Sequence, residues 1–505
     1  MGGKSVWILG DQLLRSHPAL EQTADGSVRI VLVESLEQAQ RRPYQRKKLV
    51  LLFSAMRHYA EALRGAGYEV DYVRAARAID GLRQHVAAHE PDALYTMAAS
   101  SYRGRRFQRE YLAGKLGIQV VVIPNSQFLV EEHNPVPDPE PERQYIMEYF
   151  YRDMRRHYNV LMTADDEPLG GQWNYDKQNR KPLPQSVSPP ADPSFEPDEI
   201  TRAVMDEVAE LSGLSGTVEG FAYAVTHQGA QAAFGNFIAH RLAQFGPYED
   251  ALSQRSHSLF HSVLSPYLNI GLLEPRPLIR AAERAYREER APLNSVEGFV
   301  RQILGWREFI YWQYWRQMPE LLAKNSWEAR RAIPAFFWTG QTDMACLAHA
   351  LQRAVTTGYN HHIERLMVIG NFCMLAGLEP AAVNDWFSSL YIDAYDWVMP
   401  PNVIGMALNA DGGLTATKPY IASANYINKM GDHCQQCTFD HQARHGQEAC
   451  PYNFLYWNFL LEHESRLRSN PRLGPNVLGL RYLDEADRQA VRADAKVFLD
   501  GLRSR

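Results

Sequence analysis

The first 125 residues hold short apolar segments that alternate with helical patterns. Six such segments predict buried strands: residues 5–10, 29–33, 49–53, 70–73, 93–95 and 120–123. Helical patterns separate several of them, notably over residues 55–65. Strands that are apolar along their whole length are typical of parallel sheets covered by helices on both faces. The sequence therefore predicts an α/β domain over residues 1–125, built on a parallel, Rossmann-like sheet.

Polar residues follow two of these predicted strands. Asp11 comes directly after Gly10, at the end of the first strand, and Glu34 ends the second. The carboxyl ends of parallel strands form the ligand crevice of such sheets, so a ligand is expected there. Gly10 lacks the Gly-x-Gly-x-x-Gly spacing of a dinucleotide site. The sequence thus favours a bound ligand other than a dinucleotide in this domain.

The composition changes after the predicted sheet. Prolines recur between residues 135 and 197, interrupted by one amphipathic aromatic segment at 145–158. Residues 126–229 are therefore expected to form a long linker with one helix. Residues 230–505 are expected to form an all-α domain, because helical patterns dominate there and no internal repeat is evident. These patterns cover residues 230–245, 277–288, 296–316, 344–356, 361–376, 381–391 and 484–503.

Length and charge set broad limits on the protein. A chain of 505 residues is too long for one ordinary core, so two or three domains are expected. The formal charge of −5 gives no global reason to expect nucleic acid. The N-terminus runs straight into a strand pattern, and no apolar run reaches the roughly 20 residues of a membrane helix. We expect a cytoplasmic protein without membrane contact.

Three of the five cysteines lie within seventeen positions, as Cys434-Gln-Gln-Cys437 followed by Cys450. An odd cysteine count in a reducing compartment favours metal binding over a disulfide framework. Thiolates at this spacing suit either a zinc ion or an iron-sulfur cluster. A zinc site has a candidate fourth ligand in three nearby histidines, and a cluster has Cys346 or Cys373. The three histidines are His433, His441 and His445.

Adjacent histidines, His361 and His362, begin another predicted helix. Neighbouring residues on a helix point about 100° apart, so one ring can face a cavity while the other supports it. Paired histidines on a helix are more often structural than catalytic. A histidine near its unperturbed pKa of about 6.5 is nevertheless the natural proton donor at neutral pH.

Other polar and aromatic residues of the predicted helical domain can each be interpreted in a structural or a functional way. Ser262 and Ser265 flank Leu264 before a helical stretch, where hydroxyls either cap a helix or hold a phosphate. Arg365 and Asp393 lie on different elements and can form a buried ion pair. Trp338, Trp386 and Trp397 are core aromatics by default, and an electron path is the alternative.

These residues together resemble the cryptochrome/photolyase family. The flavin-domain motifs appear in the family's order as Leu264-Ser265-Pro266-Tyr267-Leu268, Trp306-Arg307-Glu308-Phe309, and Arg365 with Asp393. The histidine pair, the cysteine spacing and the start Gly10-Asp11-Gln12-Leu13 resemble one branch, the bacterial iron-sulfur photolyases that repair (6-4) photoproducts. The resemblance covers essentially the whole chain.

The resemblance implies three cofactors. They are FAD in the helical domain, a 6,7-dimethyl-8-ribityllumazine antenna in the α/β domain and a [4Fe-4S] cluster. The implied FAD residues are Ser262, Leu264, Ser265, Arg307, Arg365, Asp393, Met399 and Asn402. The implied antenna residues are Asp11, Glu34 and Leu52, and the implied cluster ligands are Cys346, Cys434, Cys437 and Cys450. Cys373 is then a bystander, as its place on an apolar helix face also favours.

The implied activity is light-driven repair of (6-4) lesions in UV-damaged DNA by a monomeric lyase. His362 is the implied proton donor with His361 supporting it, and Trp386 and Trp338 are implied in electron transfer. One departure is Met399, which stands where other members have an Asn or acidic residue near the flavin, and whose thioether is only a weak acceptor.

Three alternatives are kept beside this expectation. They are a blue-light photoreceptor of cryptochrome type, a photolyase for cyclobutane pyrimidine dimers, and a metal-stapled nucleic-acid-binding protein resembling primase large subunits. Cyclobutane dimers need an electron but no proton relay, so the histidine pair favours the (6-4) lesion.

Overall fold

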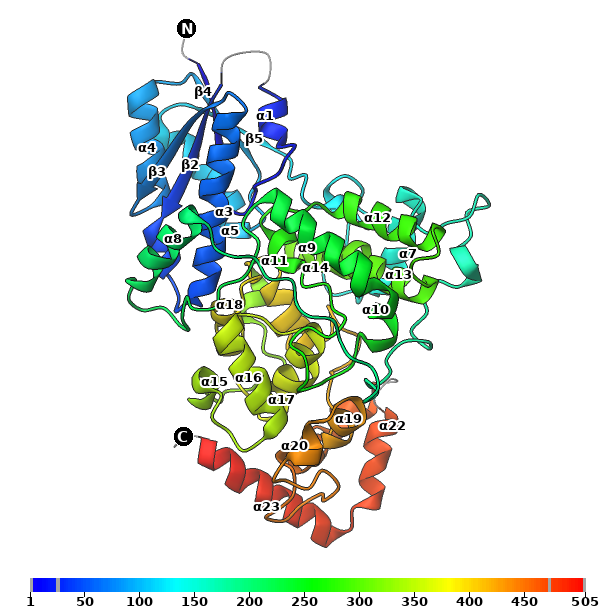
Figure 1. Cartoon of the computed structure of the whole chain (residues 1–505). Coiled ribbons are helices and arrows are strands. Elements are labelled where there is room, and N and C mark those ends of the chain that lie inside the picture. The colour runs from blue at the N-terminus through cyan, green and yellow to red at the C-terminus, as the bar shows by residue number, and fades with distance from the viewer. Residues whose placement is uncertain (1–2, 24–27, 471–473, 503–505) are drawn as a thin grey trace.

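The computed structural model describes residues 3–23, 28–470 and 474–502, and places an α/β domain on a larger helical domain (Figure 1). Five parallel strands run in the order β3-β2-β1-β4-β5. They are β1 (Lys4–Ile8), β2 (Val28–Ser35), β3 (Glu69–Ala75), β4 (Ala93–Met97) and β5 (Gln119–Ile123). The chain reverses its strand order at β1, as in doubly wound folds. The predicted fold class is confirmed.

One predicted strand was wrong. Residues 49–53 lie inside α3 (Arg46–Gly65), whose first half is buried on almost every side. The helix packs between the sheet and the helical domain, so Leu49, Val50, Leu51 and Phe53 are all covered. A helix buried all round shows no apolar period, and a short apolar run of this kind cannot be told from a strand.

Besides α3, further helices lie in the α/β domain and in the segment that follows it. They are α1 (Pro18–Glu21), α2 (Leu36–Gln40), α4 (Ala78–His89), α5 (Tyr102–Arg106), α6 (Leu112–Leu116), α7 (Met147–Tyr158) and α8 (Glu199–Ala209). The helix expected at 145–158 is α7. The stretch 126–229 also contains α8, which the sequence analysis did not predict, and which packs beside α3 (Figure 1).

Every predicted helical pattern is present as a helix in the helical domain, which also contains helices that were not predicted. Its first half comprises α9 (His227–His240), α10 (Leu242–Tyr248), α11 (Ser265–Asn269), α12 (Pro275–Arg287), α13 (Leu293–Val300), α14 (Glu308–Gln317) and α15 (Phe336–Thr339). Its second half comprises α16 (Ala345–Thr357), α17 (Asn371–Leu375), α18 (Pro380–Leu390), α19 (Ala424–Met430), α20 (Pro451–Glu462), α21 (Glu464–Arg468), α22 (Gly474–Leu478) and α23 (Glu485–Gly501). The predicted patterns fall on α9, α10, α12 to α14, α16 to α18 and α23, whereas α11, α15 and α19 to α22 were not predicted.

Three π-helical segments are set into these helices. They are η4 (Arg301–Arg307), between α13 and α14; η6 (Glu364–Gly370), leading into α17; and η7 (Pro401–Ala407). π-helical turns are rare and occur often at functional sites. The segments η4, η6 and η7 therefore mark a candidate functional region of the helical domain.

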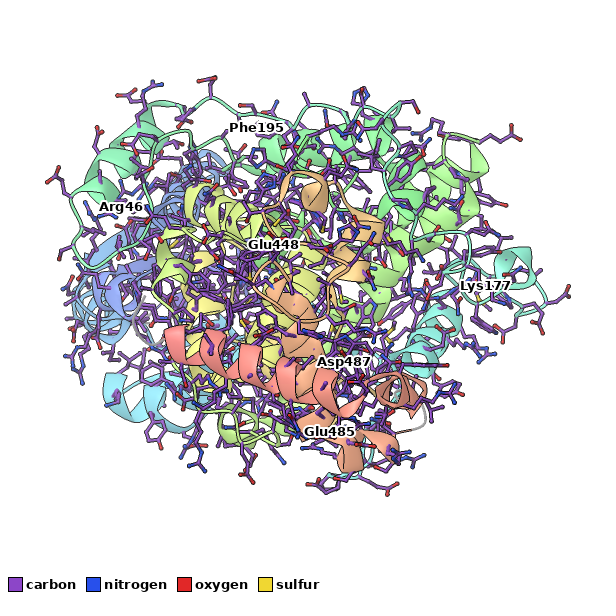
Figure 2. The ribbon with its side chains drawn as sticks, turned by 90° about the horizontal axis from the view of Figure 1, so that it is seen from below. Arg46, Lys177, Phe195, Glu448, Glu485 and Asp487 are labelled. Carbon is purple, nitrogen blue, oxygen red and sulfur yellow. The ribbon has the colours of Figure 1, made fainter. Side chains whose placement is uncertain are left out.

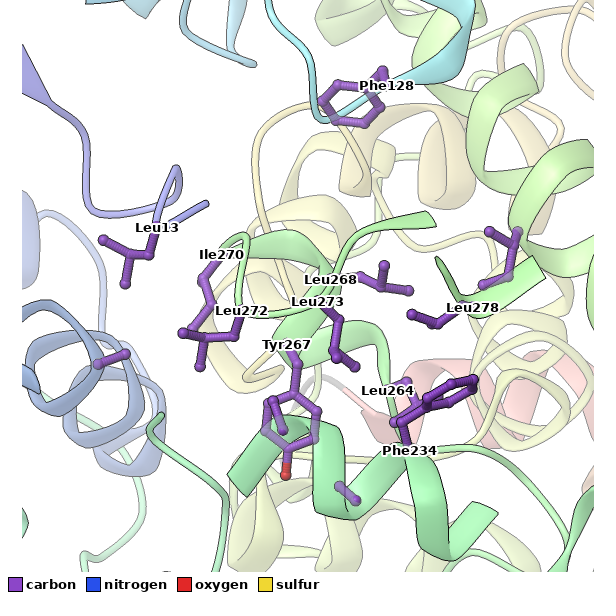
Figure 3. Close-up of a cluster of buried hydrophobic side chains, with 14 of the residues drawn as sticks. Leu13, Phe128, Phe234, Leu264, Tyr267, Leu268, Ile270, Leu272, Leu273 and Leu278 are labelled. Carbon is purple, nitrogen blue, oxygen red and sulfur yellow. The ribbon is translucent and has the colours of Figure 1, made fainter. Parts of the chain in front are cut away.

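A shared apolar core joins the two domains. Leu13 from the α/β domain packs with Ile270 and Leu272 of the helical domain (Figure 3). The backbone N–H of Leu13 also donates to the carbonyl of Ile270 at 2.8 Å. Within the described ranges, no helix is long and apolar enough to cross a lipid bilayer.

Candidate functional site

A cavity of about 910 Å³ lies within the helical domain. Its wall contains all eight residues expected to bind FAD: Ser262, Leu264, Ser265, Arg307, Arg365, Asp393, Met399 and Asn402. These residues are spread over 140 positions of sequence, so the fold rather than a local motif brings them together. A cavity of this volume is in the range of large cofactor sites.

The three π-helical segments supply much of this wall. Arg307 comes from η4, Arg365 from η6 and Asn402 from η7. A π-turn adds one residue to a helix and so changes the direction of the side chains that follow. The irregular turns thus direct polar side chains from three apolar helices into one space.

Arg365 and Asp393 form the buried ion pair that the sequence suggested. The guanidinium donates two parallel hydrogen bonds of 2.9 and 3.0 Å to the two carboxylate oxygens. Ser265 donates its hydroxyl to the same carboxylate at 2.6 Å. Because bidentate pairs fix geometry as well as charge, this pair holds η6 against the segment after α18. Burial alone would lower the pKa of Arg365. The charge of Asp393 and the nearby tyrosines outweigh burial, so the pKa is raised.

Arg307 is buried in the cavity wall with part of its guanidinium unpartnered. Its Nη1 donates to the Gln127 carbonyl and to Glu308, whereas Nε and Nη2 have no protein partner. Burial lowers the pKa of Arg307. Unpartnered buried donors are costly, so their presence beside a cavity fits a polar or anionic group bound there.

The two predicted catalytic histidines occupy different environments. His362 lines the cavity, its side chain is 44% exposed, and its Nε2 lies 3.5 Å from a carboxylate oxygen of Asp250. His361 is buried, and neither of its ring nitrogens has a hydrogen-bond partner. Burial holds the pKa of His361 well below its usual range, with the neighbouring histidines contributing. His361 is therefore neutral near pH 7.

Sequence reasoning missed three neighbours of this pair. The His261 ring stacks on His361 with 4.4 Å between centroids and contacts the edge of His362. Asp250 faces His362, and the adjacent Glu249 lines the same cavity. Burial raises the pKa of Glu249 to about 8. All three lie in or beside the irregular segment between α10 and α11, where no periodic pattern marks a residue as facing inward.

The predicted electron-transfer tryptophans lie on one route from the cavity to the surface. Phe387 lines the cavity and contacts Trp386, whose ring is buried and packs on Phe337 at 5.2 Å between centroids. Trp338, next in sequence to Phe337, is 38% exposed. The two tryptophans are thus separated by one phenylalanine position, and their role in electron transfer stays a prediction.

The three residues expected in the antenna site lie in different surroundings. Asp11 is partly buried, accepts a hydrogen bond of 2.8 Å from the Ser100 hydroxyl, and has its pKa raised by burial. Leu52 lies on α3, where its side chain covers Gly10. The Glu34 carboxylate is surrounded by protein donors, which are Arg57, Arg74 and the Tyr72 hydroxyl. Glu34 is therefore held by the protein itself, while Asp11 and Leu52 lie together near Gly10.

Cys346, Cys434, Cys437 and Cys450 surround one small pocket. Burial raises the pKa of Cys346 well above its usual value, and the other three sulfurs add to this effect. Thiols grouped in this way become thiolates when a cation lies among them. Cys373 is fully buried in α17 and lies outside this pocket wall.

The three histidines considered as alternative ligands differ in availability. His445 pairs with Asp487 at 3.0 Å, at the N-terminal end of α23, the long helix that crosses the face seen in Figure 2. His433 lies 3.0 Å from His349, nitrogen to nitrogen. His441 lines the cysteine pocket. Among the described residues, only Asp71, His85 and His89 place three metal-binding atoms within 4.8 Å of one another.

Known proteins with related sequences and structures show to which family the chain belongs. The family described as deoxyribodipyrimidine photo-lyase-related protein matches residues 6–223. A (6-4) photolyase from Agrobacterium fabrum is 42% identical over 509 residues, which cover 98% of each chain.

Two solved structures share the fold. A bacterial class III photolyase from Agrobacterium tumefaciens has a TM-score of 0.61 at 17% identity, covering 85% of this chain and 84% of that one. A cryptochrome from Synechocystis has a TM-score of 0.59 at 16% identity, covering 91% and 90%. With the full-length similarity to the Agrobacterium fabrum protein, these findings show that the chain belongs to the cryptochrome/photolyase family.

Proposed function

We propose that this protein is a light-driven lyase that repairs (6-4) pyrimidine-pyrimidone photoproducts in DNA. The observation that carries the proposal is His362 in the wall of a cofactor-sized cavity, in a chain 42% identical over its whole length to a (6-4) photolyase. Cyclobutane dimers need no proton donor at the lesion. A partly exposed imidazole at this position therefore favours the (6-4) lesion over the dimer.

FAD is the cofactor that the cavity residues fit. Its binding residues in this chain would be Ser262, Leu264, Ser265, Arg307, Arg365, Asp393, Met399 and Asn402. When bound, reduced FAD supplies the light-driven electron for repair. Arg307 offers its two unpartnered donors to the cofactor, and the Arg365–Asp393 pair keeps two elements of the wall in register. Met399 gives the wall a thioether where a stronger hydrogen-bonding group is usual in the family.

His362 positions the proton that repair needs. Its Nε2 faces Asp250, whose carboxylate stabilises a charge on the ring. His261 and His361 lie beside it, and burial keeps the pKa of both well below the usual value for histidine. The His261 ring contacts both other rings, and His362 is the one of the three that is partly exposed, so His362 is the proposed proton donor.

The cavity mouth suits a damaged base that has left the duplex. Lys429 lines the cavity and offers positive charge to the DNA backbone, whereas Tyr426 offers a ring to stack on a base. Extruding a base costs a few kcal/mol, and less for a poorly stacked lesion. UV-damaged DNA is therefore the proposed substrate.

The four cysteines are proposed to hold a [4Fe-4S] cluster, and the α/β domain is proposed to hold a ribityllumazine antenna near Asp11 and Leu52. The convergence of four thiols on one pocket supports the first proposal. Iron and acid-labile sulfide should each approach four per chain. Cys346→Ser should lower both, and Cys373→Ser should lower neither, because Cys346 lines the pocket and Cys373 does not.

The function is tested with an oligonucleotide that carries one (6-4) lesion. Blue light and a reductant should restore the undamaged bases, as read by chromatography of the DNA, while dark samples should stay unchanged. Protein that carries reduced FAD but yields no repaired product would contradict the proposal. Repair of a cyclobutane-dimer oligonucleotide instead would assign the alternative lesion, and a cellular light response without repair would assign a photoreceptor.

A further inference from the structure

A group of three metal-binding side chains lies in the α/β domain, far from the cysteines and the cavity. His85 and His89 are one turn apart on α4, so both rings leave the same face of the helix. Asp71 lies opposite them on the edge strand β3. The Oδ2 atom of Asp71 is 2.7 Å from His85 Nδ1 and 2.7 Å from His89 Nε2. The three ligand atoms thus lie within 4.8 Å of one another.

We propose that Asp71, His85 and His89 form a binding site for one divalent transition-metal ion, with zinc as the ion to test. Two imidazole nitrogens and one carboxylate oxygen are a donor set that zinc, cobalt, nickel and ferrous iron share, whereas magnesium and calcium prefer oxygen ligands alone. Three protein ligands leave a fourth position for water. Asp71 and His89 have side chains that are 28% and 25% exposed, so an ion can reach them from solvent.

The surroundings of the group support ion binding. The second ring nitrogen of His85, Nε2, lies 2.8 Å from the Ser5 hydroxyl on β1. A hydrogen bond to the far nitrogen orients a histidine ligand and fixes its tautomer. His89 is the last residue of α4, and the C-terminal end of a helix favours a positive charge.

One cation competes with an ion at this position. Arg29 Nη1 lies 3.4 Å from His89 Nε2. Arg29 also pairs with Glu69, which offsets its charge. Arg29 therefore lowers the affinity of the site for a metal ion. It does not block the site, because a small movement of this partly exposed side chain frees the Nε2 atom of His89.

The site lies away from the proposed chemistry. Ser5 is near the start of β1, and the N-terminal end of the sheet points away from the helical domain (Figure 1). An ion here would join the last turn of α4 to the edge strand β3. Its expected effect is therefore on the stability of the α/β domain, and repair does not depend on it.

The test titrates zinc chloride into untagged, full-length protein that carries its native cofactors, followed by calorimetry and metal analysis after desalting. Wild-type protein should bind one more equivalent of zinc than His89→Ala or Asp71→Asn, with affinity about 100-fold higher. Excess zinc should raise the melting temperature of wild type and leave both variants unchanged. His58→Ala is the matched control, because it removes a histidine paired with a single carboxylate, Asp198, in the same part of the molecule.

Two outcomes would overturn the proposal. One is wild-type protein that binds no more zinc than the two variants, and the other is equal zinc affinity in all four proteins. Circular dichroism and melting in EDTA show whether each variant is folded. If His89→Ala is not folded, Asp71→Asn, which keeps the side-chain shape, gives the same comparison.

Discussion

His362 differs from its histidine neighbours in solvent access, and this difference decides which ring can exchange a proton. We expect His362→Asn to lower the rate of (6-4) repair by about 100-fold or more, the usual range for a lost general acid. Flavin content and the flavin absorption spectrum should stay unchanged, because the ring does not hold the wall together. His240→Asn, at an exposed helix end, is the control. Repair by His362→Asn within threefold of wild type would remove the proton-donor role.

Glu249 gives the stability of the protein a specific pH dependence. Burial raises the pKa of its carboxyl from 4.5 to about 8, so the folded protein keeps the proton where the unfolded chain has lost it. A raised pKa stabilises the fold at acidic pH, and this contribution is lost as pH rises from about 4.5 to 8. Glu249 can change the free energy of unfolding by at most about 5 kcal/mol over this pH range.

The change Glu249→Gln removes this dependence because an amide does not titrate. We expect the variant to melt at a higher temperature than wild type at pH 8.5 and at a similar temperature at pH 4.5. Thermal melts at the two pH values measure the difference. A melting difference that is the same at both values would show that Glu249 is ionised in the folded protein.

At the scale of elements, the Arg365–Asp393 pair joins η6 to the segment after α18. Asp393→Asn keeps the shape but leaves the Arg365 charge buried without its partner. Breaking a buried pair in this way typically costs about 3–5 kcal/mol. Urea unfolding should show this loss, and FAD should bind more weakly. Asp80→Asn, which removes the exposed Arg77–Asp80 pair, should leave the unfolding midpoint unchanged. Equal midpoints for both variants would mean that the buried pair contributes nothing.

The length of an apolar pattern decided whether a buried element was assigned correctly. The helices expected at 296–316, 361–376 and 484–503 are present, although the first two are buried on nearly all sides. Their patterns are too long for a strand. The π-turns within the first two carry no separate signal, because they add one residue without changing composition. Residues 49–53 were assigned to a strand because the first half of α3 is buried on almost every side and this short apolar run has the length of a strand.

Residues of the cavity wall were predicted from family motifs rather than from apolar periodicity. Arg307, Arg365 and Asp393 are recognised as members of a family motif, and the fold then places them in one wall. His261, Asp250 and Glu249 come from an irregular segment with neither a period nor a motif. Their approach to His362 depends on packing between distant elements, which no local pattern records.

At the scale of the whole molecule, the start of α3 ties the two domains together. Gln45 Nε2 donates to the Val355 carbonyl at 3.1 Å, and Lys47 Nζ donates to the Thr356 carbonyl at 2.7 Å. Both carbonyls belong to the last turn of α16, where a helix favours positive charge. Arg46 donates to the carbonyls of Leu211, Leu214 and Gly216.

These bonds predict that the two domains unfold together. Wild-type protein should give one calorimetric transition, because Leu13, Ile270 and their neighbours share a single core. The double variant Gln45→Ala/Lys47→Ala should melt at a lower temperature, with the α/β domain unfolding first as a separate transition. Two separate transitions in wild-type protein would show that the domains are energetically independent.

The three π-helical turns have a consequence for how relatives of this chain are compared. Each turn in η4, η6 and η7 contains one residue beyond what a regular helix of that length would hold. Deleting a single residue there would restore an ordinary helix and rotate everything after it by about 100°. The helices would still align end to end, yet the arginine or asparagine would leave the wall. A one-residue gap at 301–307, 364–370 or 401–407 in an alignment of relatives therefore says more about the shape of the cavity than a substitution does. Each such gap identifies relatives in which different side chains face the cavity.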